Sequence, residues 1–152
     1  LGKGRFYGHI REGEYAEALI EILAAVNNFD GIRTLVIDFE GGAKVRKSFI
    51  DKAEQTSIVP LSGGGSNLLP AVRLLQEQVL KGKRRLLFLL SDGEINDREQ
   101  AERELNDYCR RNHIEMVKIT FDEEDKYGYE HTTIINLHRF LARRIIEKGA
   151  AY

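Results

Sequence analysis

Short apolar runs and helical stripes alternate along this chain, and their alternation predicts its fold class. The apolar runs typical of β-strands are residues 32–39, 84–92 and 114–121. Helical periodicity marks residues 14–28, a short piece at 50–55, residues 70–82, residues 98–112, and a last helix opening at Thr132 or Thr133. Because helices and strands follow one another in turn, we predict an α/β fold with a mainly parallel sheet.

Turn and capping residues refine these elements. Gly41-Gly42 turns residues 32–39 back into residues 43–49, which predicts an antiparallel hairpin at one edge of the sheet. Asp97 is a good N-cap for the helix at 98–112. The helix behind Pro70 is predicted from Ala71, Leu74, Leu75, Gln78 and Val79. The side chains expected to face the core are Ala101, Leu105, Tyr108 and Cys109 in the next helix, and Ile135, Leu137 or His138, Leu141, Ile145 and Ile146 in the last.

The strand at residues 84–92 ends in a candidate site. Its unbroken apolar run closes on Ser91-Asp92-Gly93 and is typical of a strand buried on both faces. In a parallel α/β sheet, ligand sites are built on the loops that leave the carboxyl ends of strands. Asp92 is therefore a candidate for chemistry or for holding a metal, and an ordinary turn cap is the alternative.

A second candidate loop, Gly63-Gly64-Gly65-Ser66-Asn67, precedes the helix behind Pro70. We expect it on the same rim of the sheet as Asp92, where its glycines let the backbone approach a ligand closely. The Ser66 hydroxyl and the Asp92 carboxylate are hard oxygen ligands, suited to Mg²⁺ or Ca²⁺ rather than to zinc. A phosphate cradle at the helix N-terminus and a plain glycine turn are the alternatives. The loop lacks the Lys-Ser or Lys-Thr pair of a P-loop.

Composition limits the function classes. The length of 152 residues suits one domain, and a net charge of −1 argues against a nucleic-acid-binding or membrane-binding surface. No stretch approaches the roughly 20 apolar residues of a membrane span, and the first residues show no signal-peptide pattern. Cys109 is the single cysteine, which fits a reducing compartment, and we expect a cytoplasmic protein.

The two loops together resemble von Willebrand factor A (vWA) domains. The Gly-Gly-Gly-Ser-Asn-Leu segment resembles the family's second metal-site loop, where Thr usually stands in place of Ser66, and the strand ending in Ser91-Asp92-Gly93 resembles its next strand. The order of elements is similar over most of the chain. The resemblance implies a Rossmann-like three-layer sandwich with helices on both faces of the sheet. It also implies a metal-ion-dependent adhesion site (MIDAS), in which Ser66 binds Mg²⁺, or Mn²⁺ or Ca²⁺, and Asp92 contacts the ion or its bound water.

The function implied by the resemblance is protein–protein interaction and not catalysis. The bound ion keeps one position open for an acidic residue of the partner protein, and intracellular members of the family often partner AAA+ ATPases. From the residues themselves, we find no nucleophile–base pair of the Ser/His or Cys/His kind. We therefore expect no enzyme, no nucleic-acid partner and no membrane insertion.

The chain departs from the family at its first metal-site motif, Asp-x-Ser-x-Ser, which is absent. Residues 1–5 resemble the stretch just after that motif, and residues 148–152 resemble the approach to a last edge strand. We therefore expect residues 1–152 to be a vWA-like domain without its first central strand and last edge strand. That first strand would lie between residues 34–39 and 86–92, supplied by upstream chain or by a partner; natural degeneration is the other explanation. Metal binding is expected only where the Asp-x-Ser-x-Ser loop is present.

Two other functions stay open. One is a divalent-metal-dependent enzyme that uses Ser66 and Asp92 on a phosphorylated substrate, and the other is a scaffold whose metal site has decayed. The carboxylates at residues 122–125 suit a solvated loop better than a second metal site. His131 and His138, seven residues apart, would share one helical face, but no third ligand accompanies them.

Overall fold

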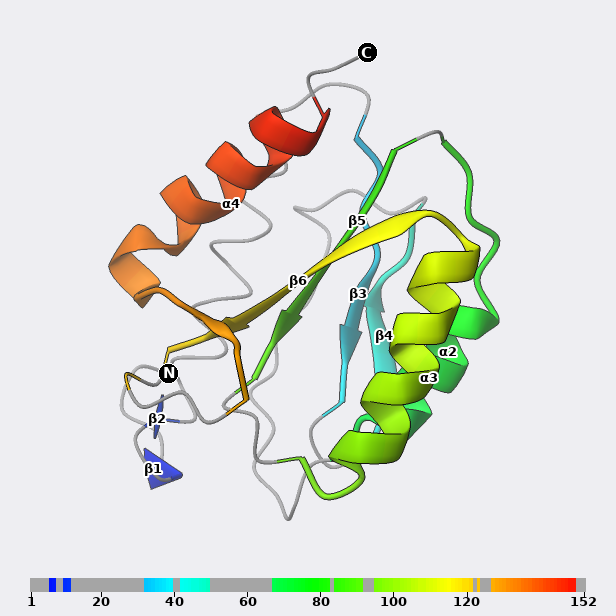
Figure 1. The fold of residues 1–152 in the computed structure, drawn as a ribbon, viewed down its shortest axis with the longest axis horizontal. Helices are drawn as coiled ribbons and strands as arrows, with labels where there is room; N and C mark the ends of the chain where they lie inside the picture. Colours follow the sequence, from blue (N-terminus) through cyan, green and yellow to red (C-terminus); the bar gives the residue numbers. More distant parts are fainter. Residues whose placement is uncertain are drawn as a thin grey trace. The chain divides into compact units, whose positions relative to one another are not determined.

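The computed structural model describes residues 6–7, 10–11, 32–39, 42–49, 67–82, 84–91, 95–121, 123 and 127–149. The chain divides into two compact units. Figure 1 labels the helices and strands of the described residues. The first comprises residues 1–36, 45–62 and 132–152, and the second comprises residues 37–44 and 63–131. The predicted helices at 14–28 and 50–55 lie outside the described residues.

The second unit contains a parallel sheet of three strands in the order β5-β6-β7. These strands are β5 (Arg85–Leu90), β6 (Ile114–Thr120) and β7 (Glu130–His131). Both neighbouring pairs are parallel, with Leu87 opposite Met116 and Ile119 opposite Glu130. Helix α2 (Leu69–Gln76) precedes β5, and helix α3 (Arg98–Arg111) connects β5 to β6. The predicted α/β class with a parallel sheet is therefore confirmed.

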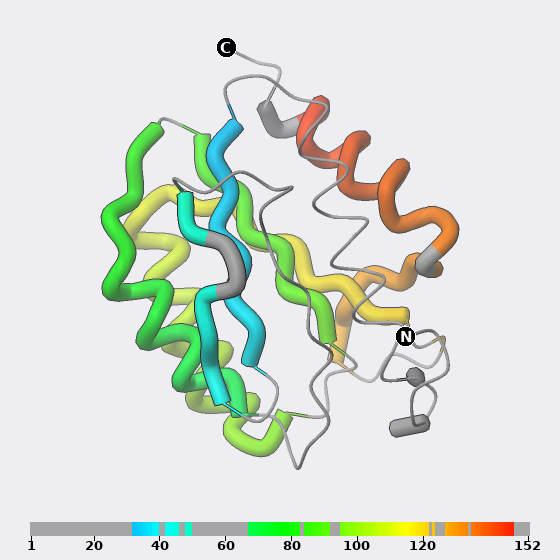
Figure 2. The backbone as a smooth tube through the Cα atoms, turned by 180° about the vertical axis from the view of Figure 1, so that it is seen from behind, coloured from blue at the N-terminus to red at the C-terminus, as the bar shows by residue number. Residues whose placement is uncertain are grey.

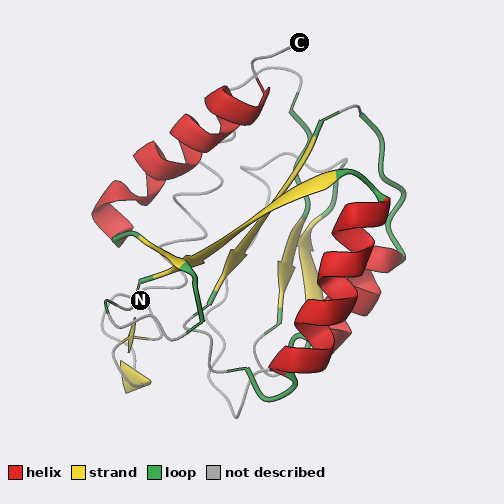
Figure 3. Cartoon of the chain, in the orientation of Figure 1, coloured by secondary structure: helices red, strands yellow, loops and turns green. Residues whose placement is uncertain are grey.

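Helices α2 and α3 pack on the same face of this sheet (Figures 2 and 3). Alternate residues of a strand point to one face, and Leu87 and Leu89 of β5 both join the core that the helices cover. The buried members of this core are Leu68, Ala71, Val72, Leu89, Ile95, Ala101, Leu105, Cys109 and Tyr129. The inner face predicted for α3 is therefore confirmed.

Strand β5 is less buried than its apolar run predicts. Leu89 is buried, whereas Leu86, Leu87, Phe88 and Leu90 are only half-buried. The expectation of a strand buried on both faces is therefore wrong. An apolar run shows that a strand can be covered on both faces, but the neighbouring elements decide how completely each residue is covered.

The predicted hairpin is present in shortened form. Strand β3 (Val36–Asp38) pairs with β4 (Lys44–Lys47) in a separate two-stranded sheet. The connection between them is too short for a parallel crossover, so the pair forms an antiparallel hairpin. Gly42, with φ of 128°, supplies a turn conformation that other residues rarely adopt. Among the described residues, β3 and β5 belong to different sheets and do not pair with one another. The first central strand expected between them stays a prediction.

Helix α2 ends earlier than its pattern predicts. It stops at Gln76, where the Glu77 N–H donates to the carbonyls of Arg73 and Leu74, each at 3.2 Å. Val79 then lies beyond the helix and is 74% exposed, so its predicted place in the helix is wrong. Val79 fits the helical period, but it follows the end of α2, and its side chain is exposed.

The first unit also contains a short antiparallel ladder and one long helix. Strands β1 (Phe6–Tyr7) and β2 (Ile10–Arg11) pair antiparallel. Helix α4 (Ile134–Gly149) begins after Thr133, whose carbonyl and hydroxyl accept the Asn136 N–H at 3.1 and 3.3 Å. The predicted helix start at Thr132 or Thr133 is therefore confirmed.

The buried face of α4 is narrower than predicted. Its fully buried side chains are Leu137 and Leu141, and Ile145 is also buried. Ile135 and Ile146 are 91% and 55% exposed, so their predicted inward positions are wrong. With 3.6 residues per turn, both lie about 120–140° around the helix from Leu141, outside one apolar stripe. None of the described helices is long and apolar enough to cross a membrane.

Candidate functional site

The two predicted metal ligands, Ser66 and Asp92, lie outside the described residues, as do the glycines at 63–65. The structure describes the residues that flank them: Asn67 and Leu68 after the first loop, and Ser91 and Ile95 on either side of the second. Within the described ranges, no three His, Cys, Asp or Glu side chains gather closely enough to hold a metal ion. The structure therefore shows the residues that flank the two loops, and these are described next.

Asp97 connects the segments that follow the two candidate loops. Its Oδ1 accepts the Leu68 N–H at 2.8 Å, and its Oδ2 accepts the Leu69 N–H at 2.9 Å. Asp97 does occupy the N-cap position of α3, but its side chain makes no capping hydrogen bond to that helix. The predicted capping role is therefore corrected: the carboxylate caps α2, because it turns toward the two amides at the start of that helix.

This contact uses the free amide groups at the N-terminus of α2. The N–H groups of Leu68 and Leu69 both donate to Asp97, and Pro70, the next residue, has no N–H group. The carboxylate also supplies the negative charge that a helix N-terminus favours. A phosphate group at this helix end would have to displace Asp97 or lie beside its charge. The arrangement disfavours the phosphate cradle.

Buried residues anchor both loops to the core. Leu68 is 3% exposed and holds the end of the first loop. The Ser91 N–H donates to the Ile119 carbonyl at 3.0 Å, which extends the β5–β6 pairing to the start of the second loop. Ile95, 7% exposed, then returns this second loop to the core. The chain is therefore held in place at Leu68, Ser91 and Ile95.

A charge cluster forms around Glu102 of α3, whose side chain is buried. Glu102 Oε1 accepts the Tyr129 hydroxyl at 2.9 Å and Lys118 Nζ at 3.3 Å, and Oε2 accepts Arg98 Nη1 at 3.1 Å. The Arg98 guanidinium also lies 4.3 Å from the centre of the Tyr127 ring. These contacts hold the segment that follows β6 against α3. The sequence pattern contained a signal for Glu102, since it lies three residues before Leu105 and seven before Cys109, on the inner face.

The cysteine and its tyrosine neighbour are poor nucleophiles. Burial raises the pKa of the Cys109 thiol from 9.0 to about 11, so the thiol stays protonated at neutral pH. Burial also raises the pKa of Tyr108, with the neighbouring Cys109 acting in the same direction and Arg85 in the opposite one. The Tyr108 hydroxyl donates to the Leu75 carbonyl at 3.3 Å, which gives it a structural role between α3 and α2.

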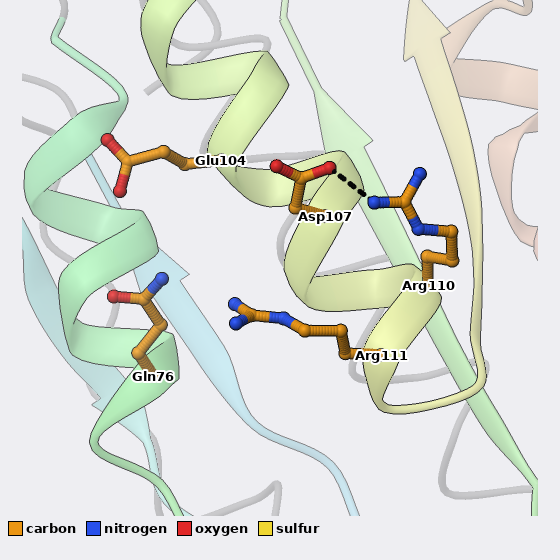
Figure 4. Close-up of a pocket in the computed structure, with 5 residues that line it drawn as sticks. All are labelled: Gln76, Glu104, Asp107, Arg110 and Arg111. Carbon is orange, nitrogen blue, oxygen red and sulfur yellow. Dashed lines mark hydrogen bonds and ion pairs between the residues drawn. The ribbon is translucent and has the colours of Figure 1, made fainter.

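A hollow of about 300 Å³ lies between α2 and α3 (Figure 4). It is lined by Gln76, Glu104, Asp107, Arg110 and Arg111. Arg110 pairs with Asp107 at 2.8 Å, but both side chains are largely exposed. Water screens an ion pair that is this exposed, so the pair contributes little to stability. This hollow contains no arrangement of groups that indicates catalysis.

The weaker candidates do not form the predicted pattern. His131 lies in strand β7 and His138 in helix α4, so they do not share a helical face, and that expectation is wrong. The error arises because the last helix starts after Thr133, beyond His131. Of the acidic residues at 122–125, only Glu123 is described, and it is exposed.

Comparisons with known proteins bear on the fold alone. No protein-family model and no curated protein matches this sequence. Among solved structures, the chain is similar to proximal thread matrix protein 1 from the mussel byssus (crystal form 2), with a TM-score of 0.64 and 14% identity. The match covers 89% of this chain and 43% of the mussel chain. At this identity, the similarity shows a shared fold and leaves function undetermined.

Proposed function

We propose that the chain is a protein–protein interaction domain of the vWA type, with Ser66 and Asp92 as ligands of a metal-ion-dependent adhesion site. One observation carries this proposal: the Asp97 carboxylate joins the residues directly after the Ser66 loop to the residues after the Asp92 loop. The described segments that follow the two candidate ligand loops, distant in sequence, are thereby joined to one another. The resemblance further implies a three-layer sandwich with helices on both faces of the sheet.

The side chains proposed as ligands fit a hard divalent cation. Hydroxyl and carboxylate oxygens favour Mg²⁺, Mn²⁺ or Ca²⁺, whereas zinc prefers nitrogen and sulfur ligands. Ser66 would hold the ion through its hydroxyl, and Asp92 would contact the ion or accept a hydrogen bond from its bound water. When bound, the ion supplies an open coordination position for a carboxylate. Ligands from an Asp-x-Ser-x-Ser loop are required to complete this set.

The partner proposed for this site is a protein that presents an Asp or Glu side chain. A cation held by few anionic ligands stays electrophilic, and an incoming carboxylate both neutralises it and completes its coordination. By resemblance to intracellular vWA proteins, an AAA+ ATPase is the partner class we propose.

The two alternative functions make different demands on the site. An enzyme acting on a phosphorylated substrate would benefit from free amides at the start of α2, but Leu68 and Leu69 donate theirs to Asp97. This observation favours the interaction domain over the enzyme. A scaffold with a decayed metal site would keep the Asp97 contact without binding metal, so metal binding separates it from the proposed function.

The test is a metal titration of the protein, with and without an upstream strand that ends in Asp-x-Ser-x-Ser joined to residue 1. With that strand present, we expect Mg²⁺ or Mn²⁺ at 100 times its dissociation constant to stabilise the fold by about 2.7 kcal/mol. Ser66→Ala and Asp92→Ala are expected to abolish the rise in melting temperature and to leave the metal-free melting temperature nearly unchanged. Asp107→Asn, which removes an exposed carboxylate from α3, is the control and is expected to keep the full rise.

The outcomes separate the three functions. A rise that survives in both Ser66→Ala and Asp92→Ala contradicts the assigned ligands. Absence of any rise with the upstream strand present supports the scaffold with a decayed site. Hydrolysis of a generic phosphomonoester such as p-nitrophenyl phosphate, lost in both variants, would support the enzyme.

A further inference from the structure

Helix α4 presents two large apolar side chains to solvent. Ile135 is 91% exposed and Ile146 is 55% exposed, although the same helix buries Leu137, Leu141 and Ile145 on another face. A single exposed isoleucine is common on protein surfaces and needs no explanation. These two isoleucines, however, lie roughly 16 Å apart along one helix, which is about three full turns. They therefore lie on the same side of α4.

The residues between the two isoleucines continue along that side. We call this set the α4 stripe; it consists of Ile135, Arg139, Ala142 and Ile146. At about 100° per residue, its members lie within roughly 60° of arc around the helix. Their spacing of four, three and four residues is that of the contact seam between two packed helices. Ala142 is small, so a second helix can approach the middle of the stripe closely.

The charge along the α4 stripe is positive. Arg139 lies within the stripe and Arg143 lies about 40° further around the helix, and both side chains are exposed. Within the described residues, neither arginine forms an ion pair. Glu147, the acidic residue of α4, lies about 80° from Arg139 around the helix axis, outside the stripe. A partner that covers the stripe is therefore favoured by carboxylates placed opposite the two arginines.

We propose that the α4 stripe is a docking surface for an amphipathic helix of a partner protein, one that carries apolar residues along its face and acidic residues beside them. The apolar residues of the partner cover Ile135 and Ile146, and its carboxylates pair with Arg139 and Arg143. This inference goes beyond the proposed function, because no residue of the stripe belongs to the proposed metal site and docking needs no bound ion.

A second copy of this chain is a poorer occupant of the stripe. Two α4 helices that pack along their stripes, in either direction, bring Arg139 and Arg143 of both copies into one seam. Like charges placed together across an interface suppress that pairing. An acidic helix has no such repulsion.

The test measures the binding of three synthetic peptides to the unsubstituted protein by fluorescence anisotropy. The first carries leucines at the spacing of the α4 stripe with glutamates beside them, and a hydrocarbon staple on its far side holds it helical. The second has lysines in place of the glutamates, and the third has alanines in place of the leucines. We expect the first peptide to bind at least about 10-fold more tightly than either of the others, since it alone matches both the apolar and the charged groups.

Substitutions in the stripe separate its two contributions. Ile135→Ala and Ile146→Ala are each expected to weaken binding of the first peptide about 10-fold, because each removes apolar contact area. Arg139→Glu is expected to weaken binding of the first peptide and to strengthen binding of the lysine peptide. The matched controls are Arg103→Glu, at an exposed position on α3, and Val79→Ala, at an apolar residue that is 74% exposed. Each control is expected to change the affinity less than about 2-fold.

Three results overturn the proposal. The first is equal binding of the three peptides, or an equal loss in Arg103→Glu and Arg139→Glu. The second is self-association of the unsubstituted protein in analytical ultracentrifugation that Ile135→Ala abolishes, since this assigns the stripe to a second copy. The third is binding to phosphatidylserine vesicles that Ile135→Ala abolishes, since this assigns the stripe to a membrane surface. Circular dichroism of each variant verifies that folded proteins are compared.

Discussion

The charge cluster around Glu102 allows a quantitative prediction, because its contacts differ in burial. The Glu102 side chain is 10% exposed, whereas those of Arg98 and Lys118 are 30% and 29% exposed. Tyr129 is only 5% exposed. If Glu102 is shortened to Ala, the two cations can turn toward water, but the buried Tyr129 hydroxyl loses the Glu102 carboxylate as its acceptor. The Tyr129–Glu102 hydrogen bond therefore outweighs the two ion pairs.

The cost of each substitution follows from this difference. A hydrogen bond to a charged group contributes about 1.5–3 kcal/mol, and an ion pair open to solvent contributes about 0.2–1 kcal/mol. We expect Tyr129→Phe to lower the free energy of unfolding by about 2 kcal/mol, since Glu102 keeps both cations. Glu102→Ala is expected to cost about 3 kcal/mol, which adds the weaker ion pairs to the loss of the acceptor. In the double variant, the costs are not additive, because both substitutions remove the same hydrogen bond.

The measurement is urea unfolding followed by far-ultraviolet circular dichroism, since the chain has no tryptophan. A change in stability moves the midpoint and leaves the denaturant slope unchanged. Arg110→Ala is the control: its pair with Asp107 is shorter, at 2.8 Å, but the two side chains are 78% and 49% exposed. We expect it to cost less than about 0.5 kcal/mol. A cost for Arg110→Ala equal to that of Tyr129→Phe would refute the reasoning from burial.

Two further predictions concern the buried face of α4 and the buried thiol. Leu141→Ala is expected to cost about 2–5 kcal/mol of stability, because Leu141 is 2% exposed. Ile135→Ala is expected to change stability by less than about 0.5 kcal/mol, because Ile135 is 91% exposed. Equal costs in urea unfolding would contradict the buried face assigned to α4. Because burial raises the pKa of Cys109 to about 11, the native state keeps a proton that the unfolded chain loses above about pH 9. The contribution of the Cys109 thiol to stability is therefore fully present below about pH 9 and decreases as the pH rises toward about 11. Cys109→Ala is expected to remove this part of the dependence of stability on pH. The same dependence in both proteins would contradict the prediction.

The sequence by itself determined the class of the fold and most of its described elements. The apolar run before Asp92 and the helical stripe with Ala101 and Leu105 were sufficient to predict β5 and α3, because hydrophobic periodicity reports local structure directly. The hairpin of β3 and β4 and the start of α4 after Thr133 were predicted from glycines and capping residues for the same reason. Ser66 and Asp92 remain predictions, since both lie outside the described residues.

Only the tertiary structure decided which partners the polar side chains find. An aspartate before a helix predicts a cap, but the sequence does not contain the position of α2, to which the Asp97 carboxylate binds. Glu102 similarly reaches Tyr129 and Lys118 on segments that come later in the chain, and β7 forms only where β6 offers it an edge. Likewise, the period of α4 allowed a wider apolar face, but packing buried only one stripe of it. Periodicity is a local property of the chain, whereas burial and hydrogen bonding depend on residues that folding brings together from distant parts of the sequence.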